Sequence, residues 1–178
     1  MSAPDVSLVI PAFNEARRLP ASLRRVADFC AAAPWLCEVI VVVEKSTDET
    51  LELATQAAAE RGNVQIIDNK VHRGKGYAVR SGVLRAGGTI VFYMDADLST
   101  PLDEITRFME FFAAHPDVDA LVGNRQHARS EIVRRQTWLR EAMGQTFNAI
   151  LRAFAPVRLR DRILPLPLII FFNDSVSL

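Results

Sequence analysis

The chain of 178 residues has 21 basic and 21 acidic side chains, a formal net charge of zero, and 49% apolar residues. This composition excludes a disordered tail, a collagen-like fibre and an acidic solvating segment. A domain of this length withdraws roughly 70% of its unfolded surface from water, and no Gly/Ser/Pro-rich linker divides the chain. We therefore expect one domain with a substantial core.

Short apolar runs rich in β-branched residues predict buried strands, and the segments between them have apolar residues at helical spacing. In chain order, we expect strands at 7–11, 38–43, 64–67, 89–94 and 118–122. The helices between them are expected from Pro20 to Pro34, from the N-cap Asp48 to Gly62, from about Gly74 to Ala86, and from Pro101 to Ala114. This alternation predicts an α/β fold with a mostly parallel sheet and right-handed crossovers.

Positive charge is concentrated in the last third of the chain. Residues 1–123 carry 12 Lys/Arg and 17 Asp/Glu, whereas residues 124–162 carry nine Arg and three acids. Within this segment, residues 130–154 predict a long amphipathic, basic helix. Its Arg residues favour an anionic partner, such as phosphate groups or a lipid surface, and packing of its apolar stripe on the chain's own core is the alternative.

The compartment is indicated by what the sequence lacks. Cys30 and Cys37 are too few, and too unlike CxxC, for a disulfide framework or a zinc site. The N-terminus has no secretion-signal pattern, and the apolar run ILPLPLIIFF is about half the ~20 residues of a membrane span. We expect a cytoplasmic protein without a transmembrane span.

Acidic residues directly follow four of the expected strands. Ligands of open α/β sheets bind beyond the carboxyl ends of the strands. The sequence places Asn14-Glu15, Glu44 to Asp48, Asp68-Asn69 and Asp95-Ala96-Asp97 at these ends. One such cluster alone is often a structural turn. Four clusters at one edge favour a binding site.

Asp95 and Asp97 are the strongest pair, because two carboxylates one residue apart can both reach a hard cation from a strand end. A bridging Mg²⁺ or Mn²⁺ reverses the repulsion between carboxylates and a diphosphate, and stabilises the charge on a departing diphosphate. Capping of the helix that follows Ser99-Thr100-Pro101 is the structural alternative.

Gly74-Lys75-Gly76 lets the backbone approach an anion closely at a helix start. It is not a Walker A loop, and no GxGxxG follows the first strand, which argues against an ATPase and a classical dinucleotide-binding protein. His72, His115 and His127 have no metal-ligand spacing, and no motif supports a Ser/His/Asp or Cys/His enzyme.

The motifs SLVIPAFNE, VIVVVEKSTDET, HRGKGYAVRSG, VFYMDADLSTP and VGNR resemble, in order and spacing, those of the family 2 glycosyltransferases. Within this family the chain is most similar to dolichyl-phosphate and polyprenyl-phosphate β-glucosyltransferases and mannosyltransferases. The resemblance covers about residues 5–161 and implies the three-layer GT-A fold. It also implies a metal-dependent, inverting transfer of a hexose, expected to be glucose from UDP-glucose, to a lipid phosphate at the cytoplasmic face of a membrane.

The resemblance also implies the roles of individual residues. The nucleotide-sugar site would comprise Pro11, Phe13, Glu15, Val42, Glu44, Ser46, Lys75, Asp95 and Ala96. Mg²⁺ or Mn²⁺ would be held at the DxD motif by Asp95, Asp97 and Ser99. The catalytic residues would be Asp97, through the metal, and Arg125 of VGNR, which would neutralise phosphate near the acceptor.

The sequence departs from the family pattern at several positions. VEKSTD stands where the family usually has VDDGSTD, so Glu44 replaces the second Asp and Lys45 the Gly. Ser99 stands where the mannosyltransferases have Gln. After Asp161 the family's acceptor-side elements are missing, so we expect a catalytic domain at 1–161 with a truncated acceptor half and an atypical tail at 162–178.

Three alternatives remain open from the sequence. DADLS nearly fits the DxDx[TV] motif of haloacid-dehalogenase-type phosphatases, but no Lys follows Lys75. A nucleotidyltransferase would show a Gly-rich basic loop where PAFNE stands. An inactive nucleotide-sugar-binding module would result from loss of the acceptor half. No feature indicates nucleic-acid binding, and whether the chain forms a homo-oligomer is left open.

Overall fold

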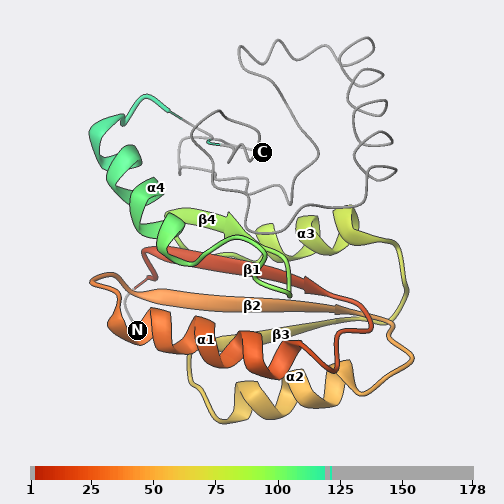
Figure 1. Cartoon of the computed structure of the whole chain (residues 1–178). Coiled ribbons are helices and arrows are strands. Elements are labelled where there is room, and N and C mark those ends of the chain that lie inside the picture. The colour runs from red at the N-terminus through yellow and green to blue at the C-terminus, as the bar shows by residue number, and fades with distance from the viewer. Residues whose placement is uncertain (1–2, 119–120, 122–178) are drawn as a thin grey trace, which may run out of the picture. The chain divides into compact units, whose positions relative to one another are not determined.

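The structure is a computed structural model that describes residues 3–118 and 121. Strands and helices alternate along this part of the chain (Figure 1). The strands are β1 (Val6–Ala12), β2 (Cys37–Glu44), β3 (Val64–Asn69) and β4 (Ile90–Tyr93). The helices are α1 (Leu19–Ala32), α2 (Thr50–Ala59), α3 (Lys75–Val83) and α4 (Asp103–Ala114). The predicted α/β alternation is confirmed.

The strands form one parallel sheet in the order β3-β2-β1-β4. Val6 of β1 lies opposite Cys37 of β2 and Ile90 of β4, so the strands begin at nearly the same level. Because all strands run in one direction, their carboxyl ends meet at one edge of the sheet (Figure 1). This edge is where the polar clusters of the sequence follow the strands.

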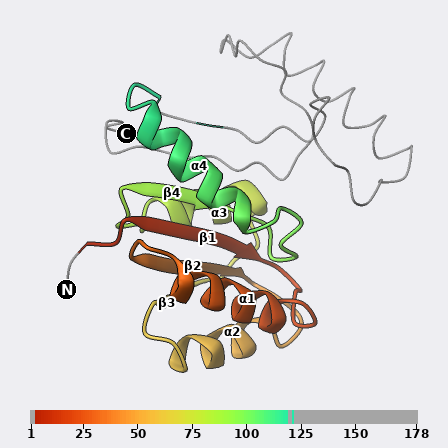
Figure 2. The ribbon, with the colours of Figure 1, turned by 60° about the vertical axis from the view of Figure 1, so that its left-hand side comes forward.

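Alternate residues of the buried strands supply two separate cores. The larger core combines one face of the sheet, including Leu8 and Ile10, with apolar side chains of α1, α2 and α4. The smaller core combines the other face, including Val9 and Val42, with Ala78 of α3. Figure 2 shows α1 and α2 together on one side of the sheet. Helices on both faces explain why the strands are apolar throughout.

Gly82 lets α3 approach the sheet closely. A Cβ atom at this position would lie 2.4 Å from Cγ1 of Val9 and 3.0 Å from Cγ2 of Val42. Helix α3 begins at Lys75, which lines the cavity at the carboxyl edge, so the packing of this helix on the sheet helps to position that lysine. The glycine thus connects the packing of the helix to the position of a charged side chain.

Several helix boundaries differ by a few residues from the sequence-based expectation, and two of them show why. The N-cap of α2 is Glu49, so the prediction that Asp48 is the N-cap was wrong, although Asp48 Oδ1 still accepts the Thr50 N–H at 3.1 Å. Helix α3 ends at Val83 because the bonds Arg85 N–H to Gly82 O and Ala86 N–H to Val83 O tighten the last turn.

Several predictions concern residues outside the described part of the chain. These are the strand 118–122, apart from Val118 and Leu121, the basic helix 130–154 and the tail 162–178. Within residues 3–118 and 121, no helix combines the length and the apolar character needed to cross a bilayer.

Candidate active site

The loops after β1 and β2 are joined by hydrogen bonds between side chains and backbone. Asn14 donates its N–H to Ser46 Oγ at 3.1 Å, and its Oδ1 accepts the Thr47 N–H at 2.8 Å. Asn14 has a φ of 54°, a left-handed conformation that Asn tolerates better than most residues. Ala16 N–H donates to Asp48 Oδ2 at 3.1 Å. The polar residues of these loops therefore hold one rim of the carboxyl edge together.

Asp95 and Asp97 lie in a tight turn that follows β4. The Leu98 N–H donates to Asp95 O at 2.9 Å, and Leu98 has a φ of 48°. A left-handed leucine costs roughly 1–2 kcal/mol, and this one is held by burial, since it is only 7% exposed and belongs to the larger core. Asp97 Oδ1 accepts the Ser99 N–H at 2.9 Å. The turn thus has its own structural reason to contain Asp97.

Glu44 is a buried carboxylate at the end of β2, with an exposed fraction of 2%. Its Oε1 accepts the Arg73 N–H at 3.1 Å, and its Oε2 accepts the Gly74 N–H at 3.0 Å. His72 Nδ1 lies 2.5 Å from Oε2, and its ring stacks on Phe13 at 4.0 Å between centroids. Gly74 has a φ of 90°, which favours glycine. These bonds fix the loop that precedes α3.

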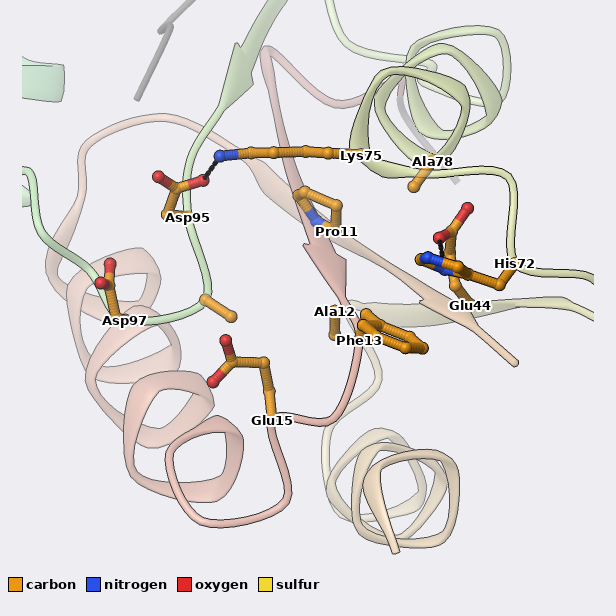
Figure 3. A pocket seen from close by; sticks show the side chains of 11 residues that line it. Pro11, Ala12, Phe13, Glu15, Glu44, His72, Lys75, Ala78, Asp95 and Asp97 are labelled. Atoms are coloured by element: carbon orange, nitrogen blue, oxygen red, sulfur yellow. Dashed lines mark ion pairs between the residues drawn. The ribbon is translucent and has the colours of Figure 1, made fainter. Parts of the chain in front are cut away.

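One cavity of about 320 Å³ collects these side chains at the carboxyl edge (Figure 3). Figure 3 shows Glu15, Asp95 and Asp97 toward one side of it, and Phe13, Glu44 and His72 toward the other. The lining residues come from the ends of β1 and β2, from the segments after β1 and β4, and from α3 and the loop before it: Pro11, Ala12, Phe13, Glu15, Glu44, His72, Lys75, Ala78, Asp95, Ala96 and Asp97.

Lys75 reaches from the first residue of α3 to the acidic turn. Its Nζ lies 2.6 Å from Asp95 Oδ1, and the hydroxyl of Tyr93 donates to the same oxygen at 2.7 Å. Burial of Tyr93, and next its hydrogen bond to Asp95, raise the pKa of the phenol well above its usual range. Tyr93 therefore stays a neutral donor at physiological pH and orients the Asp95 carboxylate.

The donor set of this cavity fits a hard divalent cation. Asp95 and Asp97 both line it, and carboxylate oxygens are the ligands that Mg²⁺ and Mn²⁺ prefer. Among residues 3–118 and 121, no group of three or more His, Cys, Asp or Glu side chains is placed to bind an ion by itself. Mg²⁺ commonly uses only one or two carboxylates and takes further ligands from substrate phosphates and water.

The structure places most of the predicted nucleotide-sugar residues around this cavity. Val42 lies elsewhere, fully buried in the smaller core, and Ser46 lies in the neighbouring loop, where its hydroxyl donates to Glu44 O at 3.0 Å. Ser99 does not line the cavity in the described residues. Arg125 lies outside them. The roles of these residues remain predictions.

The acidic cluster expected to follow the third strand, Asp68-Asn69, forms the end of β3 and does not join the site. Asp68 pairs with Lys70, and neither residue lines the cavity. Conversely, the sequence analysis did not single out His72 or Tyr93 as site residues. The signal for Tyr93 was its place two residues before Asp95 at the end of an apolar strand. For His72 there was only its position before Gly74-Lys75-Gly76.

Comparison with known proteins gives a consistent result. The family model for glycosyl transferase family 2 matches residues 7–166. An undecaprenyl-phosphate 4-deoxy-4-formamido-L-arabinose transferase of Pseudomonas fluorescens is 38% identical over 68% of this chain and 36% of its own length. A dolichyl-phosphate beta-glucosyltransferase of Drosophila melanogaster is 30% identical over 88% of this chain and 52% of its own. The chain thus spans about half, or less, of these relatives.

Solved structures show the same fold. A mannosyltransferase from Pyrobaculum calidifontis, in complex with GDP-Man and Mn²⁺, is 26% identical with a TM-score of 0.56, over 67% of this chain and 35% of that one. Glucosyl-3-phosphoglycerate synthase from Mycobacterium tuberculosis is 16% identical with a TM-score of 0.63, and the match covers 96% of this chain and 57% of that one. The predicted GT-A fold is confirmed, and the chain belongs to glycosyl transferase family 2.

Proposed function

We propose that this chain binds a nucleoside diphosphate sugar and transfers its glycosyl group to a polyprenyl phosphate. The single observation that carries the proposal is the cavity at the carboxyl edge, which Asp95, Asp97 and Lys75 line together. Two relatives are named for undecaprenyl-phosphate and dolichyl-phosphate transfer, which supports a lipid phosphate as the acceptor. Their names give an arabinose derivative and glucose, so glucose from UDP-glucose is the first donor to test.

The two sides of the cavity suit the two ends of such a donor. Phe13 is 40% exposed and presents an aromatic surface for a base, and Pro11 and Glu15 line the same cavity. Asp95 and Asp97 would hold Mg²⁺ or Mn²⁺, which supplies a Lewis acid for the diphosphate when bound. Glu44 is engaged with the backbone of Arg73 and Gly74, so we assign it to the position of this loop rather than to direct contact with the base.

The acceptor side follows from the chemistry of a phosphate monoester. Such a group is already anionic at neutral pH, so the protein needs to orient it and to offset the charge of the leaving diphosphate. Arg125 and the Arg-rich segment 124–162 would meet the lipid phosphate at a membrane surface, where each basic residue contributes about 1 kcal/mol. This peripheral attachment, at the cytoplasmic face, predicts liposome binding that weakens as salt rises.

Titration calorimetry tests the donor site directly. We expect UDP-glucose or GDP-mannose to bind in the presence of Mn²⁺, and the Asp97→Ala variant to lose metal-dependent binding while it keeps its fold. Asp28→Ala, on the exposed face of α1, is the matched control and should bind normally. Retained metal-dependent binding by Asp97→Ala would contradict the ligand assignment.

A transfer assay on polyprenyl phosphate then separates the two remaining functions. Transfer of the sugar supports the enzyme. Binding of the nucleotide sugar without turnover would identify the chain as a nucleotide-sugar-binding module. No binding of any nucleoside diphosphate or its sugar, with or without metal, would overturn the proposal.

A further inference from the structure

Lys75 forms an ion pair with Asp95, the carboxylate that a divalent cation would need as a ligand. Its Nζ lies 2.6 Å from Asp95 Oδ1, which also accepts the Tyr93 hydroxyl at 2.7 Å. This oxygen therefore has two donors. The ion pair is partly buried, since the side chain of Asp95 is 21% exposed, whereas that of Lys75 is 57% exposed. The carboxylate is fixed, and the lysine has room to move.

An ammonium group and a metal ion cannot both be close partners of the same carboxylate without repelling each other. A dication that approaches Asp95 must displace Lys75 or bind beside its positive charge. Either event costs free energy, so the ion pair lowers the affinity of the site for a metal that arrives alone. Tyr93 has no such effect, because its hydroxyl is neutral.

A diphosphate removes this cost because it offers the ammonium another anion. Lys75 has a flexible four-carbon stem, and its amine is a compact charge that suits phosphate oxygens. The side chain starts at the N-terminus of α3 and lines the same cavity as Asp97. A rotation about its own bonds would carry Nζ from Asp95 toward a bound diphosphate without any change in the backbone.

We propose that Lys75 is an internal counter-cation of Asp95 that yields its place to the metal only when a diphosphate is bound. The inference rests on the proposed function, since it assumes a nucleoside diphosphate as the ligand. Its consequence is that metal and nucleotide bind cooperatively, each strengthening the other by the same factor. Without nucleotide, the charge of Asp95 is already neutralised by Lys75, so a metal ion binds weakly.

The first measurement is the binding of Mn²⁺ in the absence of nucleotide. The electron paramagnetic resonance signal of free Mn²⁺ reports how much of the ion is bound. Lys75→Met removes the competing charge, and we expect it to bind Mn²⁺ about threefold to fivefold more tightly than the unaltered chain, the range of a partly exposed ion pair. Lys75→Arg keeps the charge and should keep the weak affinity. Arg85→Met removes a positive charge just beyond the other end of α3 and should leave the Mn²⁺ affinity unchanged.

The second measurement is UDP binding with and without Mn²⁺. Lys75→Met should weaken the binding of UDP in the absence of metal. In this variant, Mn²⁺ should strengthen the binding of UDP by a smaller factor than in the unaltered chain. Unchanged or weaker Mn²⁺ binding by Lys75→Met, in a chain that binds UDP and Mn²⁺ together, would overturn this inference alone. If none of these proteins binds Mn²⁺ or nucleotides, both the inference and the proposed function are wrong.

Discussion

The carboxylate of Glu44 accepts the backbone N–H of Gly74 at 3.0 Å and thereby ties the end of β2 to the start of α3. The same carboxylate accepts the N–H of Arg73, and His72 Nδ1 approaches it to 2.5 Å. A buried charge is tolerated only when it is hydrogen bonded or paired, and here three donors satisfy it. The loop is held at the point from which Lys75 reaches Asp95.

Replacement of Glu44 by Gln tests this role. One of the two acceptors becomes an amide NH₂ that faces a donor, so the N–H of Arg73 or Gly74 loses its partner in a partly buried site. We expect the free energy of unfolding, measured in urea, to fall by about 1–3 kcal/mol. Amide hydrogen exchange at these two positions should also accelerate. Glu60→Gln, at the exposed C-cap of α2, is the control and should change neither quantity.

Gly82 and Gly76 allow a matched test of the packing of α3. A Cβ at Gly82 would lie 2.4 Å from Val9 Cγ1, whereas one at Gly76 would meet nothing within 4 Å. We expect Gly82→Ala to destabilise the fold by about 1–3 kcal/mol through overpacking. Gly76→Ala should stabilise it by about 0.5–1 kcal/mol, because alanine favours helix. Thermal unfolding of both variants checks the two signs, and equal effects would contradict the close approach of α3.

From the residues alone, the site is clearest where its members are adjacent in the chain, and the other lining residues were expected from the resemblance to the family. Asp95 and Asp97 stand out because they share one turn, and the parallel sheet predicts that they meet the segments after β1 and β2. The position of Asp48 before a helix predicted a cap, yet the cap is its neighbour Glu49. Spacing alone does not fix a helix end to one residue.

Contacts between distant segments were not accessible in this way. The role of Glu44 depends on its hydrogen bond with Gly74, which lies in another loop. Gly74 adopts a positive φ, but a glycine in a sequence does not by itself show that its φ is positive. Asp68, at the end of β3, likewise pairs with Lys70 and does not line the cavity. A buried acid at the end of an apolar strand signals that partners exist, but the fold decides which ones.

Asp48 makes stability depend on pH. Hydrogen bonds, first from the side chain of Thr50, hold the pKa of this carboxyl below its ordinary value of 3.8. A lowered pKa contributes stability above the unfolded value, and this contribution is lost as pH falls through the folded one. Asp48→Asn should therefore be less stable than the unaltered chain at pH 7, with a difference that shrinks below about pH 3.8. Urea unfolding at pH 7 and below pH 3.8 measures this difference in stability, and Asp28→Asn is the control.

Phe13 tests which side of the cavity meets the base. Its ring stacks on His72 at 4.0 Å between centroids and lies on the side of the cavity away from Asp95 and Asp97 (Figure 3). We expect Phe13→Ala to weaken UDP binding in the presence of Mn²⁺ by about tenfold, since loss of base–aromatic stacking costs about 1–3 kcal/mol.

Inorganic pyrophosphate provides the comparison, because it has the diphosphate of UDP without the base. In the presence of Mn²⁺, Phe13→Ala should bind pyrophosphate as tightly as the unaltered chain does. Asp97→Ala should lose the metal-dependent binding of both UDP and pyrophosphate. An equal loss of UDP and pyrophosphate in Phe13→Ala would mean that the ring supports the cavity as a whole. The base would then have to bind elsewhere along the carboxyl edge.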